Sequence, residues 1–478
     1  MTTSRLASKS TAIASRKGAM IIGKFRHLHF VGIGGAGMSG MAEVLADVGY
    51  TVTGSDIARS EVTDQLEQEG IRIHIGHDAA NVGDAHVVVI SSAVHETNPE
   101  VMEAIGRNIP VIKRAEMLGE LMRLKFSIGI AGCHGKTTTT ALTGHIFKEA
   151  GLDPTVIVGG RLTDSSIGAK VGAGDYMVVE ADEYDRSFLV MYPAMAVVTN
   201  LEADHLDIYR DLDDIKAAFL QYVNRTPFYG QVIINADDQN LYDIAPHIKR
   251  ATKTFGTQPG ADYQATAIHT EGSVGVFTLL KGESTVGTIR VPLPGQHNVM
   301  NALCAATIAL ESEIPFDIVS RAIAKFPGVV RRFQLHGEVN GRSVYDDYAH
   351  HPSEVRAALD AARQFGRPVT AVFQPHLYSR TRDFAREFAE SLSVADRAFV
   401  VDIYPAREKP MPGVTSQLII DAAKALGHNH VVLAGPMSKA ATLVAQNSPT
   451  RDLVMTIGAG DIYKIIDDIL KTLERQNK

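Results

Sequence analysis

The chain has 478 residues and a formal net charge of −7 at neutral pH, and 45% of its residues are apolar. The length favours about three domains, and the acidic balance argues against a general nucleic-acid binder, which is normally basic. No run of about 18 apolar residues predicts a membrane span. The two cysteines, Cys133 and Cys304, lie far apart, which argues against a disulfide framework and favours a reducing, cytoplasmic location.

Residues 1–22 form a basic segment with Arg5, Lys9, Arg16 and Lys17 and no acidic residue. The segment lacks the continuous apolar stretch of a secretory signal. We expect a disordered basic tail, and a transit peptide is the alternative interpretation.

After this tail, strand-like and helix-like segments alternate almost to the end of the chain, which predicts an α/β fold with parallel sheets. We predict three domains: a Rossmann-like domain over 23–121, a central P-loop ATPase-type parallel-sheet domain over 122–328, and a Rossmann-like domain over 329–478. Residues 261–290 read as short alternating strands and predict an antiparallel edge of the central domain. The carboxyl ends of the parallel strands are expected to line the ligand sites.

The first glycine-rich turn, "HFVGIGGAGMSG", holds Gly32, Gly34 and Gly37 in the spacing of a dinucleotide-binding turn. Asp56 follows the next strand, where a ribose-binding acid is expected. Taken alone, this pattern indicates an NAD enzyme. Because the pattern recognises the geometry of a diphosphate, any nucleotide diphosphate fits it equally well.

The second glycine-rich turn, "FSIGIAGCHGKTTTTALTGHIF", joins an apolar strand to a helix and predicts a phosphate-binding loop. Lys136 is expected to reach the terminal phosphates, and the hydroxyl of Thr137 to bind Mg²⁺. The loop is shortened, because Ile130 stands where the full motif has glycine. Cys133 lies beside a helix N-terminus and a lysine, which predicts a lowered pKa and a more reactive thiol. The interpretation we prefer for its function is that any small side chain serves at this position, but we expect alkylation of the thiol to inhibit.

Two further strand ends suggest the metal site. Glu180 closes the strand in "YMVVEAD", and His205 follows the strand in "MAVVTNLEADHLD". A carboxylate is the oxygen ligand that Mg²⁺ prefers, whereas histidine is an unusual one. The spacing therefore favours Glu180 as a ligand and leaves His205 open between a ligand and a loop residue.

These turns, together with "PLPGQHNVMNALCA", "GVVRRFQ", "DDYAHHPSEV" and "FQPHLYSRTRD", resemble the Mur ligase family over nearly the whole chain after the tail. The resemblance implies a three-domain enzyme that uses ATP and Mg²⁺ to join L-alanine to the lactyl carboxylate of UDP-N-acetylmuramate. It implies an acyl-phosphate intermediate, release of ADP and phosphate, and a role in peptidoglycan precursor synthesis. We expect a cytoplasmic monomer or weak homodimer that binds neither nucleic acid nor membrane.

The resemblance also implies roles for individual residues. The sugar nucleotide is expected at Gly34, Gly35, Ala36, Gly37, Met38, Ser39, Asp56, Ser91 and Ser92. ATP is expected at Gly132, Cys133, His134, Gly135, Lys136, Thr137, Thr138, His297, Asn298, Asn301, Arg332 and Asp347. The metal is expected at Thr137, Glu180 and His205, and the alanine and acyl-phosphate end of the site at Tyr348, His350, His351, His376 and Arg380.

Some assignments stay open at the level of sequence. "AHHP" also fits an ordinary helix start with Pro352 in the first turn, and both interpretations can hold together. A ligase that attaches an intact tripeptide to the same sugar nucleotide is the main alternative function. An NAD-dependent oxidoreductase leaves the phosphate loop and Glu180 unexplained, and a non-catalytic nucleotide switch leaves the polar strand ends unexplained.

Overall fold

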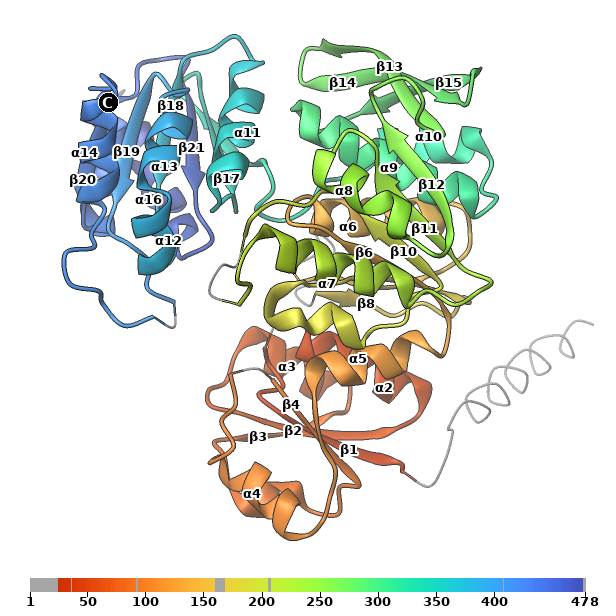
Figure 1. Ribbon diagram of the computed structural model, residues 1–478. Coiled ribbons are helices and arrows are strands. Elements are labelled where there is room, and N and C mark those ends of the chain that lie inside the picture. Colours follow the sequence, from red (N-terminus) through yellow and green to blue (C-terminus); the bar gives the residue numbers. More distant parts are fainter. Residues whose placement is uncertain are drawn as a thin grey trace, which may run out of the picture. The chain divides into compact units, whose positions relative to one another are not determined.

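The computed structural model describes residues 25–35, 37–91, 93–159, 168–204, 208–406 and 408–475 (Figure 1). The predicted tail, Ala36, Ser92 and His205 lie outside these residues. The chain divides into two compact units. The first contains the residues up to Gln264 together with Cys304–Ala322, and the second contains Ala265–Leu303 and the residues from Ile323 onward.

The N-terminal sheet is entirely parallel and has the order β3-β2-β1-β4-β5. This is the strand order of the Rossmann fold without its sixth strand, so the predicted Rossmann-like fold is confirmed. Helix α2 begins directly after the glycine-rich turn and packs Met38, Met41 and Leu45 against the sheet. The strands are β1 His27–Val31, β2 Thr51–Asp56, β3 Arg72–Ile75, β4 Val87–Ile90 and β5 Val111–Lys113, and the helices are α2 Met38–Val48, α3 Glu61–Gln68, α4 Pro99–Gly106 and α5 Arg114–Met122.

The central sheet has the order β15-β14-β13-β12-β11-β10-β6-β9-β7-β8. Its middle strands are parallel, whereas β7–β8 and β14–β15 are antiparallel, so the predicted parallel sheet is mixed at its edges. The strands expected over 261–290 are confirmed as β13, β14 and β15. The strands are β6 Phe126–Ala131, β7 Thr155–Ile157, β8 Ala169–Lys170, β9 Tyr176–Glu180, β10 Met195–Val198, β11 Gln231–Asn235, β12 Ala251–Gly256, β13 Tyr263–Glu271, β14 Val274–Lys281 and β15 Ser284–Val291.

Among the residues that the structure describes, five α-helices accompany this sheet along the chain. They are α6 Lys136–Glu149, α7 Leu212–Asn224, α8 Gln239–Ile244, α9 Gln296–Glu311 and α10 Phe316–Ala324. The short helix η2, Tyr184–Val190, follows β9. The boundary between the two compact units falls within β13 and again within α9. None of the helices in the described ranges is both long and apolar enough to cross a membrane.

The C-terminal sheet has the order β16-β17-β21-β18-β19-β20, and only the pair β16–β17 is antiparallel. Apolar residues of α11, α13 and α14 form one core and those of α15 and α16 another, which gives the two-sided covering predicted for a Rossmann-like domain. The strands are β16 Gln334–Val339, β17 Arg342–Asp347, β18 Val369–Phe373, β19 Arg397–Val401, β20 Val431–Gly435 and β21 Leu453–Ile457. The helices are α11 Pro352–Arg363, α12 Tyr378–Asp383, α13 Ala385–Leu392, α14 Gln417–Ala425, α15 Met437–Asn447 and α16 Ile466–Arg475.

Candidate active site

The phosphate loop connects β6 to α6 through Gly132, Cys133, His134 and Gly135. Gly135 caps α6 in the left-handed conformation, with φ 78°, and Gly132 has φ 137°. A Cβ atom on Gly132 would lie 2.1 Å from Thr199 Oγ1, so no larger residue fits there without displacing Thr199. The turn presents the first N–H groups of α6, which is the geometry expected of an anion site.

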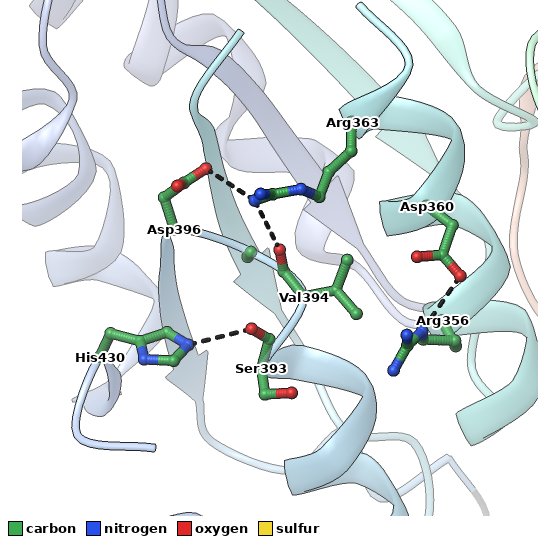
Figure 2. A pocket seen from close by; sticks show the side chains of 8 residues that line it. Arg356, Asp360, Arg363, Ser393, Val394, Asp396 and His430 are labelled. Atoms are coloured by element: carbon green, nitrogen blue, oxygen red, sulfur yellow. Dashed lines mark hydrogen bonds and ion pairs between the residues drawn. The ribbon is translucent and has the colours of Figure 1, made fainter. Parts of the chain in front are cut away.

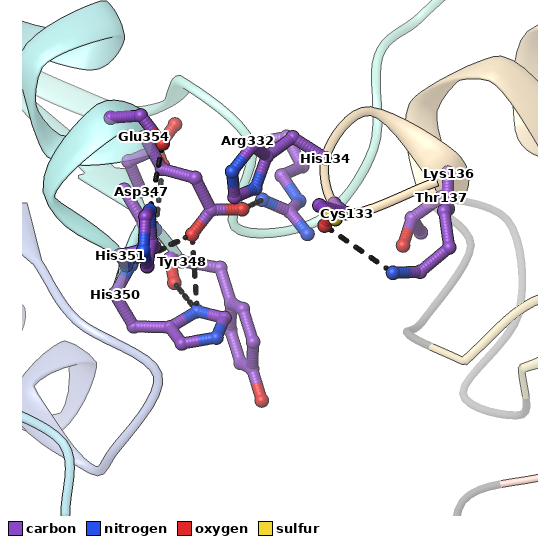
Figure 3. Close-up of polar contacts among 12 residues, drawn as sticks. Cys133, His134, Lys136, Thr137, Arg332, Asp347, Tyr348, His350, His351 and Glu354 are labelled. Atoms are coloured by element: carbon purple, nitrogen blue, oxygen red, sulfur yellow. Dashed lines mark hydrogen bonds and ion pairs between the residues drawn. The ribbon is translucent and has the colours of Figure 1, made fainter. Parts of the chain in front are cut away.

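Lys136 forms an ion pair with Glu183 at the start of α6. Its Nζ lies 2.7 and 2.9 Å from the two carboxylate oxygens of Glu183 and donates to the carbonyl of Gly132 at 2.6 Å. It also donates to the carbonyl of Cys133 at 3.3 Å (Figure 3). Burial opposes ionisation of Lys136, but the neighbouring carboxylates outweigh it and raise the pKa. Lys136 is therefore charged, and its ammonium group lies against the carbonyls of the loop. The sequence reasoning did not single out Glu183.

Thr137 and Glu180 lie together as the metal prediction requires. The Thr137 hydroxyl donates to Glu180 Oε1 at 3.0 Å, and the N–H of Gly159 donates to Glu180 Oε2 at 2.6 Å. Burial raises the pKa of Glu180, so a cation beside it would favour the ionised form. A hydroxyl and a carboxylate at this distance are oxygen donors suited to Mg²⁺.

The loop after β10 braces the phosphate loop. His134 donates its backbone N–H to Asn200 Oδ1 at 2.8 Å, and its carbonyl accepts from Thr199 Oγ1 at 2.6 Å and from Asn200 Nδ2 at 2.9 Å. These contacts arise because β10 lies directly beside β6 in the sheet. Thr199 and Asn200 are thus positioning residues that motif spacing could not reveal.

The prediction of a reactive Cys133 is wrong. The thiol is buried, and burial together with the charge of Glu183 raises its pKa well above the usual range. Its sulfur accepts the backbone N–H of Glu202 at 3.1 Å and donates to the carbonyl of the same residue at 3.4 Å. Cys133 is therefore a packed structural residue, and its alkylation in the folded protein is expected to be slow.

The N-terminal glycine turn is closed by Asp56. Its Oδ2 accepts the backbone N–H of Gly34 at 2.8 Å, and the carbonyl of Ser55 accepts those of Gly32 and Ile33 at 2.8 and 3.0 Å. Asp56 thus joins the end of β2 to the turn. Ser91 Oγ lies 3.2 Å from the position of a Cβ on Gly32, which puts it at the same turn.

Other residues expected near the sugar nucleotide differ in how they are placed. Met38 is fully buried in the core and Ser39 is buried, so both contribute to the turn mainly through their backbone. Gly37 caps α2 with φ 75°, and Arg114 Nη1 lies 2.8 Å from the position of a Cβ on it. Arg114 therefore sets a cation beside a helix N-terminus, and the sequence reasoning missed it.

A buried polar network lies under this turn. Glu100, which is fully buried, accepts from Ser55 Oγ and from Asn81 Nδ2, both at 2.6 Å, and lies 3.2 Å from His77 Nδ1. Burial would raise the pKa of Glu100, but His29, Ser55 and Asn81 outweigh it and lower the pKa to about 2. The network fixes Ser55, whose carbonyl holds the glycine turn.

In the second unit, Asp347 ends β17 and ties two backbone segments together. Its Oδ2 accepts the N–H of Phe333 and its Oδ1 that of Ala349, both at 2.8 Å. Burial raises the pKa of Asp347 to about 6, although Arg332 and the two N–H groups lower it. Arg332 lies 3.8 Å from Glu354 and above the ring of Tyr348 (Figure 3).

Arg332 is presented by a strained turn. The residues on both sides of it, Arg331 and Phe333, have φ of 60° and 48°, a conformation that costs about 1 kcal/mol for each residue other than glycine. The Arg331 side chain donates to Asp346 at 2.8 Å and to the carbonyls of Gly458 and Gly460 at 2.5 and 3.1 Å. Arg331 thereby anchors the turn that carries Arg332.

The helix start in "AHHP" is confirmed. His351 caps α11, Pro352 opens its first turn, and Glu354 accepts the backbone N–H groups of His350 and His351 at 3.0 and 3.2 Å. The ring of His351 is buried, and its Nδ1 lies 2.8 Å from Ser353 Oγ. The ring centroid of His350 lies 5.6 Å from that of Tyr348 and 5.8 Å from that of His376.

The residues expected near adenine stand in the first turns of α9. Asn298 and Asn301 are buried, and Asn301 Nδ2 donates to Asn298 Oδ1 at 3.2 Å. Asn298 Nδ2 donates to the carbonyl of Pro294 at 2.7 Å, whereas His297 is exposed. The two amides therefore form one pair on a single side of α9.

A cavity of about 580 Å³ in the C-terminal domain lies away from these residues (Figure 2). It is lined near the amino ends of β19 and β20, whereas the site residues follow the carboxyl ends of β17 and β18. Its charged groups pair with one another, Arg356 with Asp360 at 3.0 Å and Arg363 with Asp396 at 3.3 Å. The cavity is not part of the candidate active site.

The structure thus brings the predicted residues together within each compact unit. In the first unit, Asp56 and Ser91 lie at the N-terminal glycine turn. Glu180 lies at the phosphate loop, and Thr138 lies in the first turn of α6, directly after that loop. The second unit contains Arg332, Asp347, Tyr348, His350, His351, His376, Arg380 and the asparagines of α9. Fold and site define an α/β protein of the nucleotide-binding type, with a glycine-rich turn before a helix on two different sheets.

The chain belongs to the Mur ligase family. Residues 27–126 match the family description "Mur ligase family, catalytic domain", residues 130–309 match "Mur ligase middle domain", and residues 331–460 match "Mur ligase, glutamate ligase domain". The family predicted from the sequence motifs is therefore confirmed.

Individual relatives agree with this assignment. The chain is 48% identical over 455 residues to a protein of Solibacter usitatus (strain Ellin6076) named UDP-N-acetylmuramate–L-alanine ligase, covering 95% of this chain and 96% of the relative. It is similar to the crystal structure of UDP-N-acetylmuramate-alanine ligase from Thermotoga maritima, with TM-score 0.78, 28% identity, and coverage of 95% and 100%. A murein peptide ligase from Psychrobacter arcticus gives TM-score 0.67, 26% identity, and coverage of 94% and 99%.

Proposed function

We propose that this protein is an ATP-dependent ligase that joins L-alanine to the lactyl carboxylate of UDP-N-acetylmuramate in peptidoglycan precursor synthesis. The observation that carries the proposal is the 48% identity, over nearly the whole length of both chains, to a relative of that name. The phosphate loop with a charged lysine and the separate glycine turn support it, since the reaction needs two phosphorylated ligands.

ATP is assigned to the loop of Gly132 to Gly135, with Lys136 on the terminal phosphates. Thr137 and Glu180 would hold Mg²⁺, with His205 as the third group implied by the family resemblance. The metal would neutralise charge on the phosphates during transfer. The hydrogen bond between Thr137 and Glu180 supports the donor pair, because both side chains already converge on one point.

A carboxylate must be activated before an amine can displace one of its oxygens. In the proposed reaction, an oxygen of the lactyl carboxylate attacks the γ-phosphorus of ATP, the bond to the β–γ bridging oxygen breaks, and ADP leaves. The product is an acyl phosphate. Lys136 and Arg332 offset the repulsion between two anions in this step.

The nitrogen of L-alanine then attacks the carbonyl carbon, and the tetrahedral intermediate expels phosphate and leaves an amide. Arg380 is assigned to the carboxylate of alanine, because a guanidinium binds both of its oxygens. The amine must lose a proton. We assign its acceptor to His350 or His376 and not to His351, whose ring is buried and bonded to Ser353.

The test is ADP formation by the purified protein. We expect multiple-turnover ADP formation only when UDP-N-acetylmuramate, Mg²⁺ and L-alanine are all present. Without L-alanine we expect hydroxylamine to take its place, to trap the acyl phosphate as a hydroxamate and to restore ADP formation. Replacing L-alanine by the tripeptide L-alanyl-γ-D-glutamyl-meso-diaminopimelate tests the main alternative, and faster ADP formation with the tripeptide would reverse the assignment. No ADP with any acceptor would reject the proposal.

A further inference from the structure

We propose that Tyr404 is a positioning residue for the amino-acid end of the site: its ring holds His376 in place and thereby sets the affinity for L-alanine. This inference rests on the proposed function. Tyr404 stands beyond the carboxyl end of β19 and lies outside every motif used to assign the family.

Tyr404 completes a row of four rings. The ring of Tyr348 meets that of His350 edge-on at 5.6 Å, His350 meets His376 edge-on at 5.8 Å, and His376 stacks on Tyr404 at 5.8 Å with an interplanar angle of 16°. These residues follow the carboxyl ends of three strands, β17, β18 and β19, where ligands bind in open α/β sheets. Tyr348, His350 and His376 are residues that the family resemblance places at the alanine end of the site, and Tyr404 is the one ring of the four that it does not.

The backbone fixes this stack. Beyond the ends of β18 and β19, His376 and Tyr404 form an isolated bridge. The N–H of Leu377 donates to the carbonyl of Tyr404 at 3.0 Å, and the N–H of Tyr404 donates to the carbonyl of Pro375 at 2.8 Å. Leu377 itself has φ 71°, a left-handed conformation that the bridge must hold.

A second contact anchors the same loop. Glu408 accepts the backbone N–H of Ser379 at 3.0 Å and also bonds the Ser379 hydroxyl. Ser379 directly precedes the buried Arg380. Tyr404 and Glu408 therefore hold the backbone at His376 and at the residue before Arg380, respectively.

Gly460 supports the other side of Tyr404. A Cβ on Gly460 would lie 2.6 Å from Cγ of Tyr404 and 2.4 Å from Oε1 of Gln374. The tyrosine ring thus contacts the backbone after β21 as well as the His376 ring and has little freedom to move. A His376 ring held in one position would define one side of the proposed binding site for L-alanine.

The experiment compares Tyr404→Phe with Tyr404→Leu in the full-length protein. Phenylalanine keeps the stacked ring, so we expect all three KM values within about two-fold of the wild-type values. Leucine removes a ring contact, and we expect the KM for L-alanine to rise about ten-fold while the KM values for ATP and UDP-N-acetylmuramate stay within two-fold. Thermal unfolding of each variant is measured alongside.

An unchanged KM for L-alanine in Tyr404→Leu would overturn the inference, and so would a parallel rise of all three KM values. If Tyr404→Leu does not fold, Glu408→Gln provides the measurement: we expect a roughly three-fold rise confined to the KM for L-alanine, and no rise would overturn the inference. Failure of the proposed function is distinct, because the wild-type protein would then form no ADP in response to L-alanine.

Discussion

Glu183 is the residue that most changes the description of the phosphate loop. Its carboxylate is 2% exposed and binds Lys136, whose side chain is 13% exposed. A phosphate that binds Lys136 must replace this partner or share the lysine with it. Because removing one partner of a buried pair leaves the other charge unpaired, the pair is costly to break without a replacement.

Glu183→Gln tests this exchange. We expect the variant without nucleotide to lose about 3 kcal/mol of unfolding free energy. We also expect a non-hydrolysable ATP analogue with Mg²⁺ to raise its Tm by more than it raises that of the wild type, because phosphate then supplies the missing negative charge. Thermal unfolding with and without the analogue measures both effects.

The matched control is Glu149→Gln, an exposed carboxylate at the end of the same helix α6. It should change neither the Tm nor the response to the analogue. Equal Tm increases for Glu183→Gln and the wild type would mean that Glu183 and the phosphates do not exchange at Lys136.

Asp347 is a second single residue with a testable effect, because its raised pKa predicts that the KM for ATP depends on pH. With a pKa of about 6, its carboxylate takes up a proton as the pH falls through 6 and then accepts hydrogen bonds poorly. We expect the KM for ATP to rise below pH 6 in the wild type, and to be higher but independent of pH in this range in Asp347→Asn. Initial rates between pH 5 and 8 measure this.

The raised pKa of Asp347 also predicts that the protein stays folded below pH 6, where its affinity for ATP falls. The pKa of Asp347 in the folded protein exceeds the unfolded value of about 3.9, so the folded state binds the proton more tightly. The contribution of this group to stability therefore grows as the pH falls from about 6 towards 4. A rise in KM that tracks unfolding at pH 5 would contradict the assignment to Asp347.

At the scale of elements, the β6–α6 connection depends on its neighbour β10. Gly132 leaves no room for a side chain because Thr199 occupies the space and bonds the carbonyl of His134. We expect Gly132→Ala to lower kcat at least 100-fold, since the loop must shift and since alanine is strained at φ 137°.

A double-mutant cycle with Thr199→Ala separates the two causes. We expect the loss in Gly132→Ala/Thr199→Ala to be smaller than the sum of the two single losses, because the clash with Oγ1 is gone while the backbone strain remains. Strict additivity of the losses in kcat would mean that Thr199 does not determine the need for glycine.

The same element shows how far sequence reasoning reaches. Lys136 and Glu180 could be predicted, because a motif fixes the first and a strand end fixes the second. Glu183, Thr199 and Asn200 could not, since they reach the loop only through the order β10-β6-β9, which the sequence does not state. Cys133 was misjudged for the same reason: the helix N-terminus is visible in the sequence, but burial and the charge of Glu183 are not.

At the scale of the whole molecule, the alternation of strands and helices was enough to predict three α/β sheets. The antiparallel edges of the central sheet were only partly visible, because the two-residue strand β8 carries almost no pattern. The predicted domain limits near residues 121 and 328 stay predictions. The two glycine-rich turns proposed to bind phosphate lie on different sheets, which predicts separable binding of the two nucleotides.

Lys136→Ala and Arg114→Gln test this separation as a pair. Lys136→Ala should abolish ligation and ATP binding while leaving the Kd for UDP-N-acetylmuramate within two-fold. Arg114→Gln removes the cation beside Gly37. It should weaken binding of the sugar nucleotide by about 2 kcal/mol, which is a roughly thirty-fold rise in Kd, and should leave the Kd of the ATP analogue within two-fold.

Calorimetric titration of both variants with both ligands gives the four dissociation constants. The crossed pattern is the decisive feature, because a variant that merely loosened the fold would weaken both ligands together. If Lys136→Ala weakened the binding of UDP-N-acetylmuramate as much as the binding of the ATP analogue, the two turns would not act as independent sites. The assignment of the sugar nucleotide to the N-terminal sheet and of ATP to the central sheet would then be wrong, even if both turns bind phosphate.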